Sequence, residues 1–461
     1  MSEHRDGTDA KESFVADART WCPLLLGTLG EGGVVGAGES AGRSPWEGLE
    51  VGSARVIPAS GPRAVRLRKE LADAPGDVRH ERYYLCPNGD GGEGGYVLLA
   101  ADRQEAFRAG AELLPRRCLS WRLAKRALCW ATRRGWTPPW PLWIGRDVQI
   151  LTRGRPRPVD DSLSGRLAAL STGAPGPHRK LVARLLEHED LPDRIVKFSC
   201  SEASREQVTR EASALRWLSA STITMPLGPE LWGYGEVGEV TYAVQEVLEG
   251  VPGSSRFSGA HTRFLQRLSH HSKLVPLRAL DAWKEDFEKL RGLRHVTESD
   301  WYGTLLVLRD AIEDKCPGGL VRCTPSHGDF APSNLMERGG GLQAFDWEYS
   351  SPSVPALHDL FHFVLQPGLL EQRGSAPALV ERLVSVLEGP AAPLLDSLHI
   401  SLDDCWTYMA LYLFHTMIHD EALGSPGPRQ GELRARRVGL VRLAIEGLRK
   451  VSTTTSGHVA V

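Results

Sequence analysis

Two hydrophobic patterns divide the chain near residue 250. Before that point, short apolar runs are bounded by glycine, proline and polar residues, a pattern typical of strands. We expect strands at residues 82–85, 96–100, 147–151, 180–186, 194–198, 230–234 and 240–247. From residue 258 onward nearly all readable sequence has the 3.6-residue period of helices, except residues 323–349. The pattern therefore predicts a strand-rich part followed by a helical part.

Three helices are expected within the strand-rich part, at residues 116–134, at residues 201–219 and from about residue 103. The first is amphipathic, and one of its faces gathers basic side chains: Arg122, Lys125, Arg126 and Arg133. This face is either the solvated side of a packed helix or a peripheral contact to an anionic membrane surface. The prolines of residues 135–141 cannot continue the helix, so we place a linker and a domain boundary there.

Composition and charge exclude several classes of protein. With 55 Lys and Arg against 57 Asp and Glu, the net charge is -2, and no overall field favours a nucleic-acid partner. No apolar run approaches the roughly 20 residues of a transmembrane helix, and the N-terminus lacks an export signal. The eight cysteines are scattered without a CxxC pair, which indicates reduced thiols. We therefore expect a cytoplasmic protein.

The candidate chemistry lies in one short segment. Asp329 is followed five residues later by Asn334, the spacing of phosphoryl-transfer loops in which the Asp faces the attacking hydroxyl and the Asn binds magnesium. The glycine turn at residues 339–341 suggests a hairpin, which would fold Asp346 back towards both residues. Alone, each of these residues is more often a turn or cap residue. Their combination, with His327 before and Glu348 after, favours a catalytic site.

The run from His327 to Asn334, with the Asp-Trp-Glu at residues 346–348, resembles the signature of the aminoglycoside phosphotransferase and choline kinase-like family. The resemblance covers roughly residues 146–449. It implies an α+β, two-lobed protein kinase-like fold, with a small antiparallel β-rich N-lobe and a mostly helical C-lobe, here preceded by a small α/β N-terminal module. The implied parts are a disordered tail 1–18, the module 19–140 of unknown role, the N-lobe 146–249, the C-lobe 250–449 and a disordered tail 450–461.

The resemblance also assigns roles to site residues. Asp329 would be the catalytic base, and Asn334 and Asp346 would hold Mg²⁺. Lys197 would contact the nucleotide phosphates and Glu211 would fix it through an ion pair. A nucleotide-covering loop would contain Gly173 and Gly176, and adenine would bind the backbone of the hinge between Glu246 and Leu248.

The function implied is transfer of the γ-phosphate of ATP or GTP to a hydroxyl of a small molecule, such as an aminoglycoside, a sugar, an amino alcohol or a glycan precursor. The alternative is a non-catalytic, pseudokinase-like binding module whose N-terminal extension recruits a partner. Such modules usually lose the phosphate-contacting Lys or a catalytic or metal-binding Asp. Retention of Lys197, Asp329, Asn334 and Asp346 favours catalysis.

Overall fold

The first of two structural units is built on a sheet of ten strands. In the computed structural model, this unit comprises residues 1–212 and 230–247, and the second comprises 213–229 and 248–461. The structure describes residues 49–51, 54–58, 78–87, 96–100, 146–153, 163, 166–171, 178–186, 192–221, 226–293, 300–316, 319–370, 374–422 and 430–456. The helices expected at 116–134 and from about residue 103, the tail at 1–18, Gly173 and Gly176 lie outside these residues.

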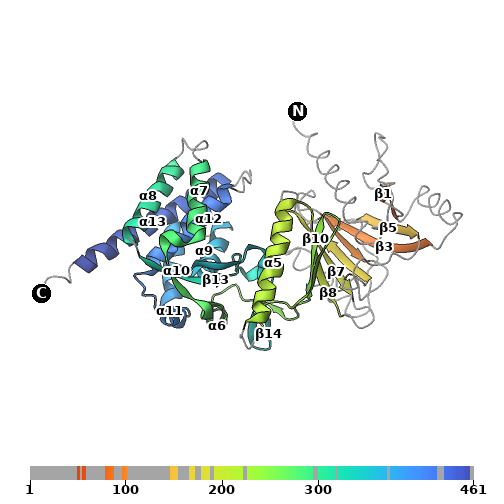
Figure 1. Cartoon of the computed structure of the whole chain (residues 1–461), viewed down its shortest axis with the longest axis horizontal. Helices are drawn as coiled ribbons and strands as arrows, with labels where there is room; N and C mark the ends of the chain where they lie inside the picture. The colour runs from red at the N-terminus through yellow and green to blue at the C-terminus, as the bar shows by residue number, and fades with distance from the viewer. Residues whose placement is uncertain are drawn as a thin grey trace. The chain divides into compact units, whose positions relative to one another are not determined.

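The ten strands are arranged in the order β1-β2-β5-β3-β4-β6-β7-β8-β10-β9, and neighbouring strands pair antiparallel. Figure 1 shows β3, β5, β7, β8 and β10 in this unit. The strands are β1 Leu49–Val51, β2 Ala54–Pro58, β3 Val78–Pro87, β4 Tyr96–Ala100, β5 Arg146–Arg153, β6 Arg166–Ser171, β7 Lys180–Leu186, β8 Arg194–Ser199, β9 Leu231–Val237 and β10 Val240–Glu246.

The hairpin expected from two strands near residues 82–100 is confirmed, because β3 and β4 pair with Tyr83 opposite Ala100. The partners of β5 differ from our expectation. The sequence placed this strand at the start of the N-lobe, yet it pairs with both β2 and β3. Strands from both sides of residues 135–141 therefore share one sheet. The division into a separate module and N-lobe stays a prediction.

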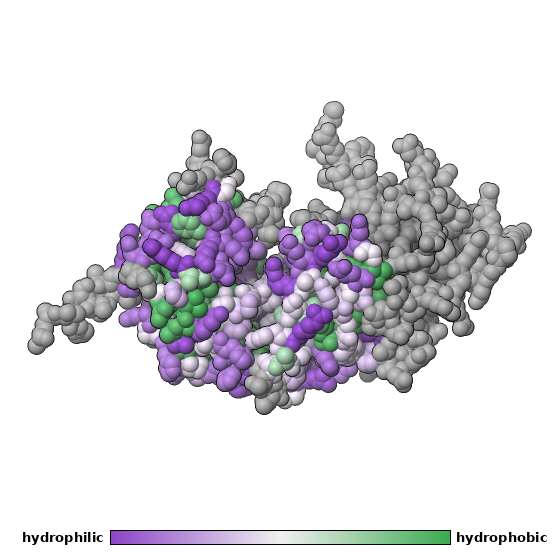
Figure 2. Space-filling view, viewed as in Figure 1, coloured by the Kyte–Doolittle hydropathy of each residue, from purple (hydrophilic) through white to green (hydrophobic). Residues whose placement is uncertain are grey.

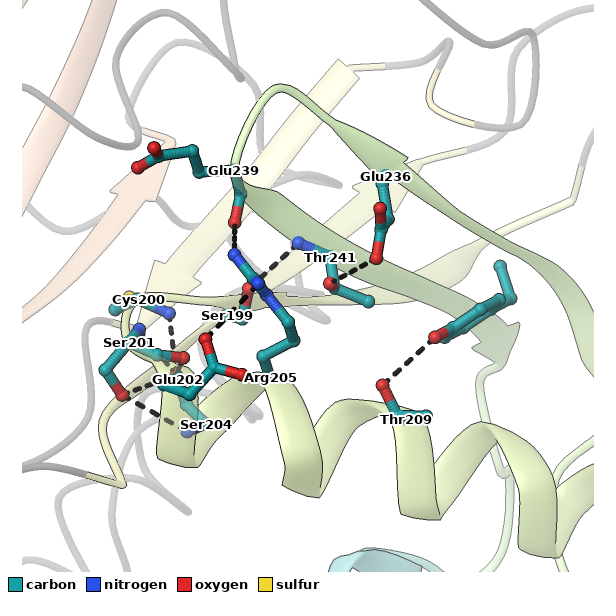
Figure 3. A network of polar contacts seen from close by, with 11 residues as sticks. Ser199, Cys200, Ser201, Glu202, Ser204, Arg205, Thr209, Glu236, Glu239 and Thr241 are labelled. Atoms are coloured by element: carbon teal, nitrogen blue, oxygen red, sulfur yellow. Dashed lines mark hydrogen bonds and ion pairs between the residues drawn. The ribbon is translucent and has the colours of Figure 1, made fainter.

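Helix α5, Glu202–Ala220, packs on this sheet through its middle turns. Val208 and Ala212 of the helix form a buried cluster with Ala243 of β10, against which Tyr234 also packs. A polar network fixes the start of the helix, where Arg205 donates a hydrogen bond to the carbonyl oxygen of Glu239 at 2.6 Å (Figure 3). One turn later, the hydroxyls of Thr209 and Tyr234 lie 3.0 Å apart. The turn of the β9–β10 hairpin and the middle of β9 thus help to set the position of α5.

The second unit is mostly helical and contains two sheets of three strands, in the orders β11-β14-β15 and β12-β13-β16. Its strands are β11 Val251–Pro252, β12 Lys273–Pro276, β13 Leu320–Ser326, β14 Leu335–Arg338, β15 Gly341–Ala344 and β16 Ser351–Pro355. Its helices are α6 Gly259–Leu268, α7 Asp281–Gly292, α8 Asp300–Lys315, α9 His358–Leu370, α10 Ala376–Glu388, α11 Ala392–Leu398, α12 Cys405–Ala422 and α13 Gln430–Ser456. Helix α13 continues past residue 450, where we expected a disordered tail.

Buried aromatic rings form the centre of the second unit. Phe330 is fully buried and stacks on Phe264 of α6, with ring centroids 5.0 Å apart. Trp347 is also buried and packs 4.6 Å from the ring of His327. These contacts hold the two segments with candidate chemistry, around residues 329 and 346, against the same core. In Figure 2 most of the described surface of this unit is hydrophilic, with hydrophobic areas interspersed on the face shown.

The expected α+β fold, with an antiparallel sheet-rich part followed by a mostly helical part, is confirmed. Among the described helices, none is both long and apolar enough to cross a membrane.

Candidate active site

The loop that follows β13 is anchored by the carboxylate of Asp359. The backbone amides of His327 and Gly328 donate hydrogen bonds to its two oxygens, at 2.7 and 3.0 Å. Burial alone would raise the pKa of Asp359, but interactions with His358 and His327 outweigh it and hold the pKa below its ordinary value. Asp359 lies in the first turn of α9 and is buried. An ionised, buried carboxylate on a packed helix therefore fixes the backbone at the start of the loop.

Both carboxylate oxygens of Asp329 are held by side chains. The Nδ2 of Asn334 donates a hydrogen bond to Oδ2 of Asp329 at 2.8 Å and to its carbonyl oxygen at 2.9 Å. On the other side, Nε2 of His362 lies 3.0 Å from Oδ1. The side chain of Asp329 nevertheless remains 40% exposed, so it is held in place and is still accessible to a ligand.

Asp329 ionises more readily than an ordinary carboxyl group. Burial alone would raise its pKa, but the hydrogen bond and charge of His362, the charge of His327 and the hydrogen bond from Asn334 act in the opposite direction. The result is a pKa below the ordinary value. Asp329 is therefore an anion at neutral pH, which is the form that can accept a proton.

The hairpin β14–β15 brings Asp346 back to the loop that carries Asp329. Its strands pair from Leu335 opposite Ala344 to the glycine turn, as expected. Beyond the paired residues, the amide of Phe345 donates a hydrogen bond to the carbonyl oxygen of Asn334 at 3.0 Å. Asp346 follows directly, in a left-handed backbone conformation (φ 71°, ψ 56°), and begins the short 3₁₀ helix Trp347–Tyr349. Asn334 and Asp346 are thus neighbours through the hairpin.

His327 joins the loop to the end of the hairpin. The amide of Asp329 donates a hydrogen bond to its Nδ1 at 3.3 Å, so this nitrogen is an acceptor. Its Nε2 lies 3.0 Å from the carbonyl oxygen of Phe345 and therefore donates to it. A ring with its hydrogen on Nε2 satisfies both contacts. His327 accordingly braces the site, and both of its ring nitrogens are occupied by these contacts.

In the first unit, Lys197 and Glu211 form a buried ion pair. The Nζ of Lys197 on β8 lies 2.6 and 2.8 Å from the two carboxylate oxygens of Glu211 on α5. The side chains are only 7% and 1% exposed. Lys197 pairs across the sheet with Ala243, and paired residues share a face, so the lysine points to the side that α5 covers. The structure therefore pairs these residues as the sequence predicted.

Of the other residues predicted to bind the nucleotide, the structure describes the hinge residues but not the loop glycines. Glu246 ends β10, and its amide donates a hydrogen bond to the carbonyl oxygen of Glu230 at 2.9 Å. The chain passes from the first unit to the second between Val247 and Leu248, where we expected the hinge. The predicted loop glycines, Gly173 and Gly176, lie outside the described residues. Adenine binding at residues 246–248 stays a prediction.

The residues present fit magnesium. Because Nδ2 of Asn334 is committed to Asp329, its amide oxygen is the atom left for a cation. The carboxylate of Asp346 offers the hard, anionic oxygen that magnesium prefers. Within the described part of the chain, no cluster of three or more His, Cys, Asp or Glu side chains could hold a metal by itself. This agrees with magnesium chemistry, in which one or two protein ligands act together with phosphate oxygens and water.

Sequence reasoning missed His362. The sequence does contain an indication that His362 lies near the loop. His362 follows Asp359 by three residues on α9, and residues at this spacing share a helix face. Two other histidines, His415 and His419 on α12, stack on each other, and Nδ1 of His415 bonds to the buried Asp286 at 2.8 Å.

Comparison with known proteins shows that part of the chain is similar to a family. Residues 181–383 match the model of the phosphotransferase enzyme family, which confirms the resemblance carried by the motifs. The curated proteins include no match to this chain.

Several solved structures are similar to this chain. A choline/ethanolamine kinase family protein from Mesorhizobium loti is 14% identical, with a TM-score of 0.41, and the match covers 64% of this chain and 96% of that one. Choline kinase LicA from Streptococcus pneumoniae is 16% identical, with a TM-score of 0.42 and coverages of 63% and 96%. Aminoglycoside phosphotransferase APH(3'')-Id from Streptomyces rimosus, in complex with ADP and streptomycin, is 14% identical, with a TM-score of 0.37 and coverages of 55% and 92%. At such TM-scores the family assignment rests on the sequence match.

Proposed function

Because residues 181–383 match the model of the phosphotransferase enzyme family, we propose that this chain is a cytoplasmic small-molecule kinase. It transfers the γ-phosphate of ATP or GTP to a hydroxyl of an aminoglycoside, a sugar, an amino alcohol or a glycan precursor. One observation carries the proposal: a single loop and hairpin gather Asp329, Asn334 and Asp346, with the Asp329 carboxylate held at both oxygens yet accessible.

Asp329 is the proposed catalytic base. Phosphoryl transfer depends mainly on positioning and on neutralising charge, with little covalent work for the protein. A fixed, anionic carboxylate can orient the acceptor hydroxyl and take its proton as the oxygen bonds to phosphorus. Each oxygen of Asp329 accepts one side-chain hydrogen bond, which leaves further acceptor capacity for that hydroxyl.

Asn334 and Asp346 are the proposed magnesium ligands. Bound there, the ion would neutralise the charge of the phosphate oxygens. Asn334 would contribute its amide oxygen, since its nitrogen is bonded to Asp329. The left-handed backbone at Asp346 places its carboxylate at the start of a 3₁₀ helix whose Trp347 is buried, which restricts its movement.

Lys197 is the proposed phosphate contact of the first unit. Glu211 fixes its ammonium group with two short hydrogen bonds. A lysine held in this way can direct its positive charge at a phosphate oxygen without losing its position. The backbone at Glu246 and Leu248 would bind the adenine, and Gly173 and Gly176 would lie in the loop over the phosphates.

Replacement of Asp346 tests the magnesium assignment. In Asp346→Asn the anionic ligand is lost while the shape of the side chain is kept, so we expect the magnesium-dependent part of ATP binding to weaken by about tenfold or more. The measurement is ATP binding by isothermal titration calorimetry at several magnesium concentrations.

Glu337→Gln is the matched control, because Glu337 lies on the same hairpin, at strand β14. An Asp346→Asn protein with the magnesium dependence of the wild type would overturn the ligand assignment.

A further inference from the structure

His362 contacts Asp329 from the side opposite Asn334, and the proposed reaction gives it no role. We propose that His362 is a positioning residue, which holds the carboxylate of Asp329 in the orientation that accepts the proton of the acceptor hydroxyl. This inference rests on the phosphotransferase function proposed above.

Helix α9 holds both the backbone of the catalytic loop and the side chain of Asp329. Asp359 accepts hydrogen bonds from the backbone amides of the loop, and His362, three residues later on the same helix face, reaches the side chain of Asp329. The helix is buried along most of its length. Asn334, by contrast, belongs to the same loop as Asp329 and moves with it. His362 is therefore the side chain that ties the orientation of the carboxylate to the packed core.

The surroundings of His362 define which form of the ring does this. An ionised carboxylate can only accept, so Nε2 of His362 carries the hydrogen that lies between the two groups. Its Nδ1 is buried and makes no hydrogen bond among the described residues. The contact with Asp329 therefore requires the hydrogen to be on Nε2.

The groups that face this ring from neighbouring elements are few. Asp329 faces it from the loop, and Tyr412 of α12 packs edge-on, with centroids 6.3 Å apart. On α9 itself, His358 stacks on His362 at 6.4 Å with an interplanar angle of 14°. Burial, the largest effect, lowers the pKa of His358 and keeps this neighbour neutral. The stack therefore adds an aromatic surface that fixes the plane of the ring without adding a charge.

Loss of His362 has a distinct consequence for Asp329. The carboxylate keeps its bond to Asn334 but becomes free to rotate about it, so a smaller fraction of molecules has the productive orientation. A role limited to packing would not produce this effect.

The test compares three replacements of His362 in the full-length protein. Phe fills the space without donating, Gln places an amide nitrogen near the position of Nε2, and Asn is too short to reach Asp329. We measure kcat and KM for turnover of Mg-ATP with water or with any acceptor found for the wild type. Thermal melting of each variant shows that it is folded, and the Asn variant replaces Phe if the latter does not fold.

In His362→Phe we expect kcat to fall by about 10²-fold with little change in KM, because the loss affects orientation and not binding. His362→Gln should recover most of kcat, because its amide nitrogen can donate to Asp329. The matched control is His271→Gln, a histidine of the same unit whose ring packs on Trp217 and His270; it should leave kcat and KM unchanged.

With an active wild type, an unchanged kcat in His362→Phe, or no recovery in His362→Gln, would overturn the positioning role. A wild type that turns over neither ATP nor GTP would instead overturn the phosphotransferase function and this inference with it. The activity of the wild type therefore distinguishes the two failures.

Discussion

At Gly328 both the backbone conformation and the close packing disfavour a side chain. Its φ of 84° lies in the left-handed region, and an added Cβ would overlap the carbonyl oxygen of Tyr349. Tyr349 ends the 3₁₀ helix that begins after Asp346. The loop with Asp329 and the turn with Asp346 therefore meet backbone to backbone at this glycine, and any side chain here would separate them.

Gly328→Ala should therefore cost more stability than a left-handed backbone alone explains. Gly340→Ala is the matched control, because Gly340 has a φ of 78° and no atom within 4 Å of an added Cβ. We expect about 1–2 kcal/mol for the control and a clearly larger loss of unfolding free energy, with lost activity, for Gly328→Ala. Urea denaturation measures both. Equal losses in the two variants would show that the contact with Tyr349 imposes no constraint.

At the residue scale, the residues proposed to act on the substrates were more predictable from sequence than the residues that hold them in place. The spacing of Asp329, Asn334 and Asp346 is local, and a glycine turn at known distance closes the hairpin between them. His362 was not predicted as a contact of Asp329, because nothing local to either residue encodes the packing of α9 against the loop. Contacts between distant segments depend on tertiary structure, which periodicity does not report.

At the scale of elements, periodicity identified most strands but not their partners. The pattern around β3, β4, β7, β8 and β10 predicted each of these strands. Strand β5 was predicted as well, but its pairing with β2 and β3 was not, because strand order is decided by contacts far apart in the chain. Strand β12 was missed, since it has only four residues, of which three are exposed.

The β8–α5 contact depends on Lys197 and Glu211. Removing one partner leaves an uncompensated charge in a buried place, so Glu211→Leu alone should cost about 3–5 kcal/mol of unfolding free energy. The double replacement Lys197→Met with Glu211→Leu removes both charges and should regain much of that loss. It should not regain ATP binding, because the proposed phosphate contact is absent.

Urea denaturation and ATP titration of the single and double variants separate the two roles. Full ATP affinity in the double variant would contradict the assignment of Lys197 as a phosphate contact. No recovery of stability would show instead that the unpaired charge of Lys197 does not cause the loss in the single variant.

At the scale of the whole molecule, the ten-stranded sheet includes strands that lie before the region that matches the family. The match begins at residue 181, in β7, whereas the sheet continues through β6 and β4 to strands that precede the match. The backbone pairs of β4 with β6 join the two regions. The N-terminal strands thus extend the sheet of the family domain, which the family resemblance, limited to residues 146–449, did not foresee.

The central claim is that this chain transfers phosphate through Asp329. Its most direct test is mass-spectrometric detection of phosphorylated product from Mg-ATP or Mg-GTP with a mixed panel of aminoglycosides, sugars, amino alcohols and a cell metabolite extract. The control is Asp329→Asn, whose amide can still accept from Asn334 and can donate to His362 once that ring changes tautomer, so the loop should stay folded.

We predict a phosphorylated product with the wild-type protein and none with Asp329→Asn, while nucleotide binding by the two proteins stays nearly equal. Equal product from both would remove Asp329 from the mechanism. No product from the wild type, together with no magnesium-dependent nucleotide binding, would contradict the kinase function and favour a kinase-like binding module.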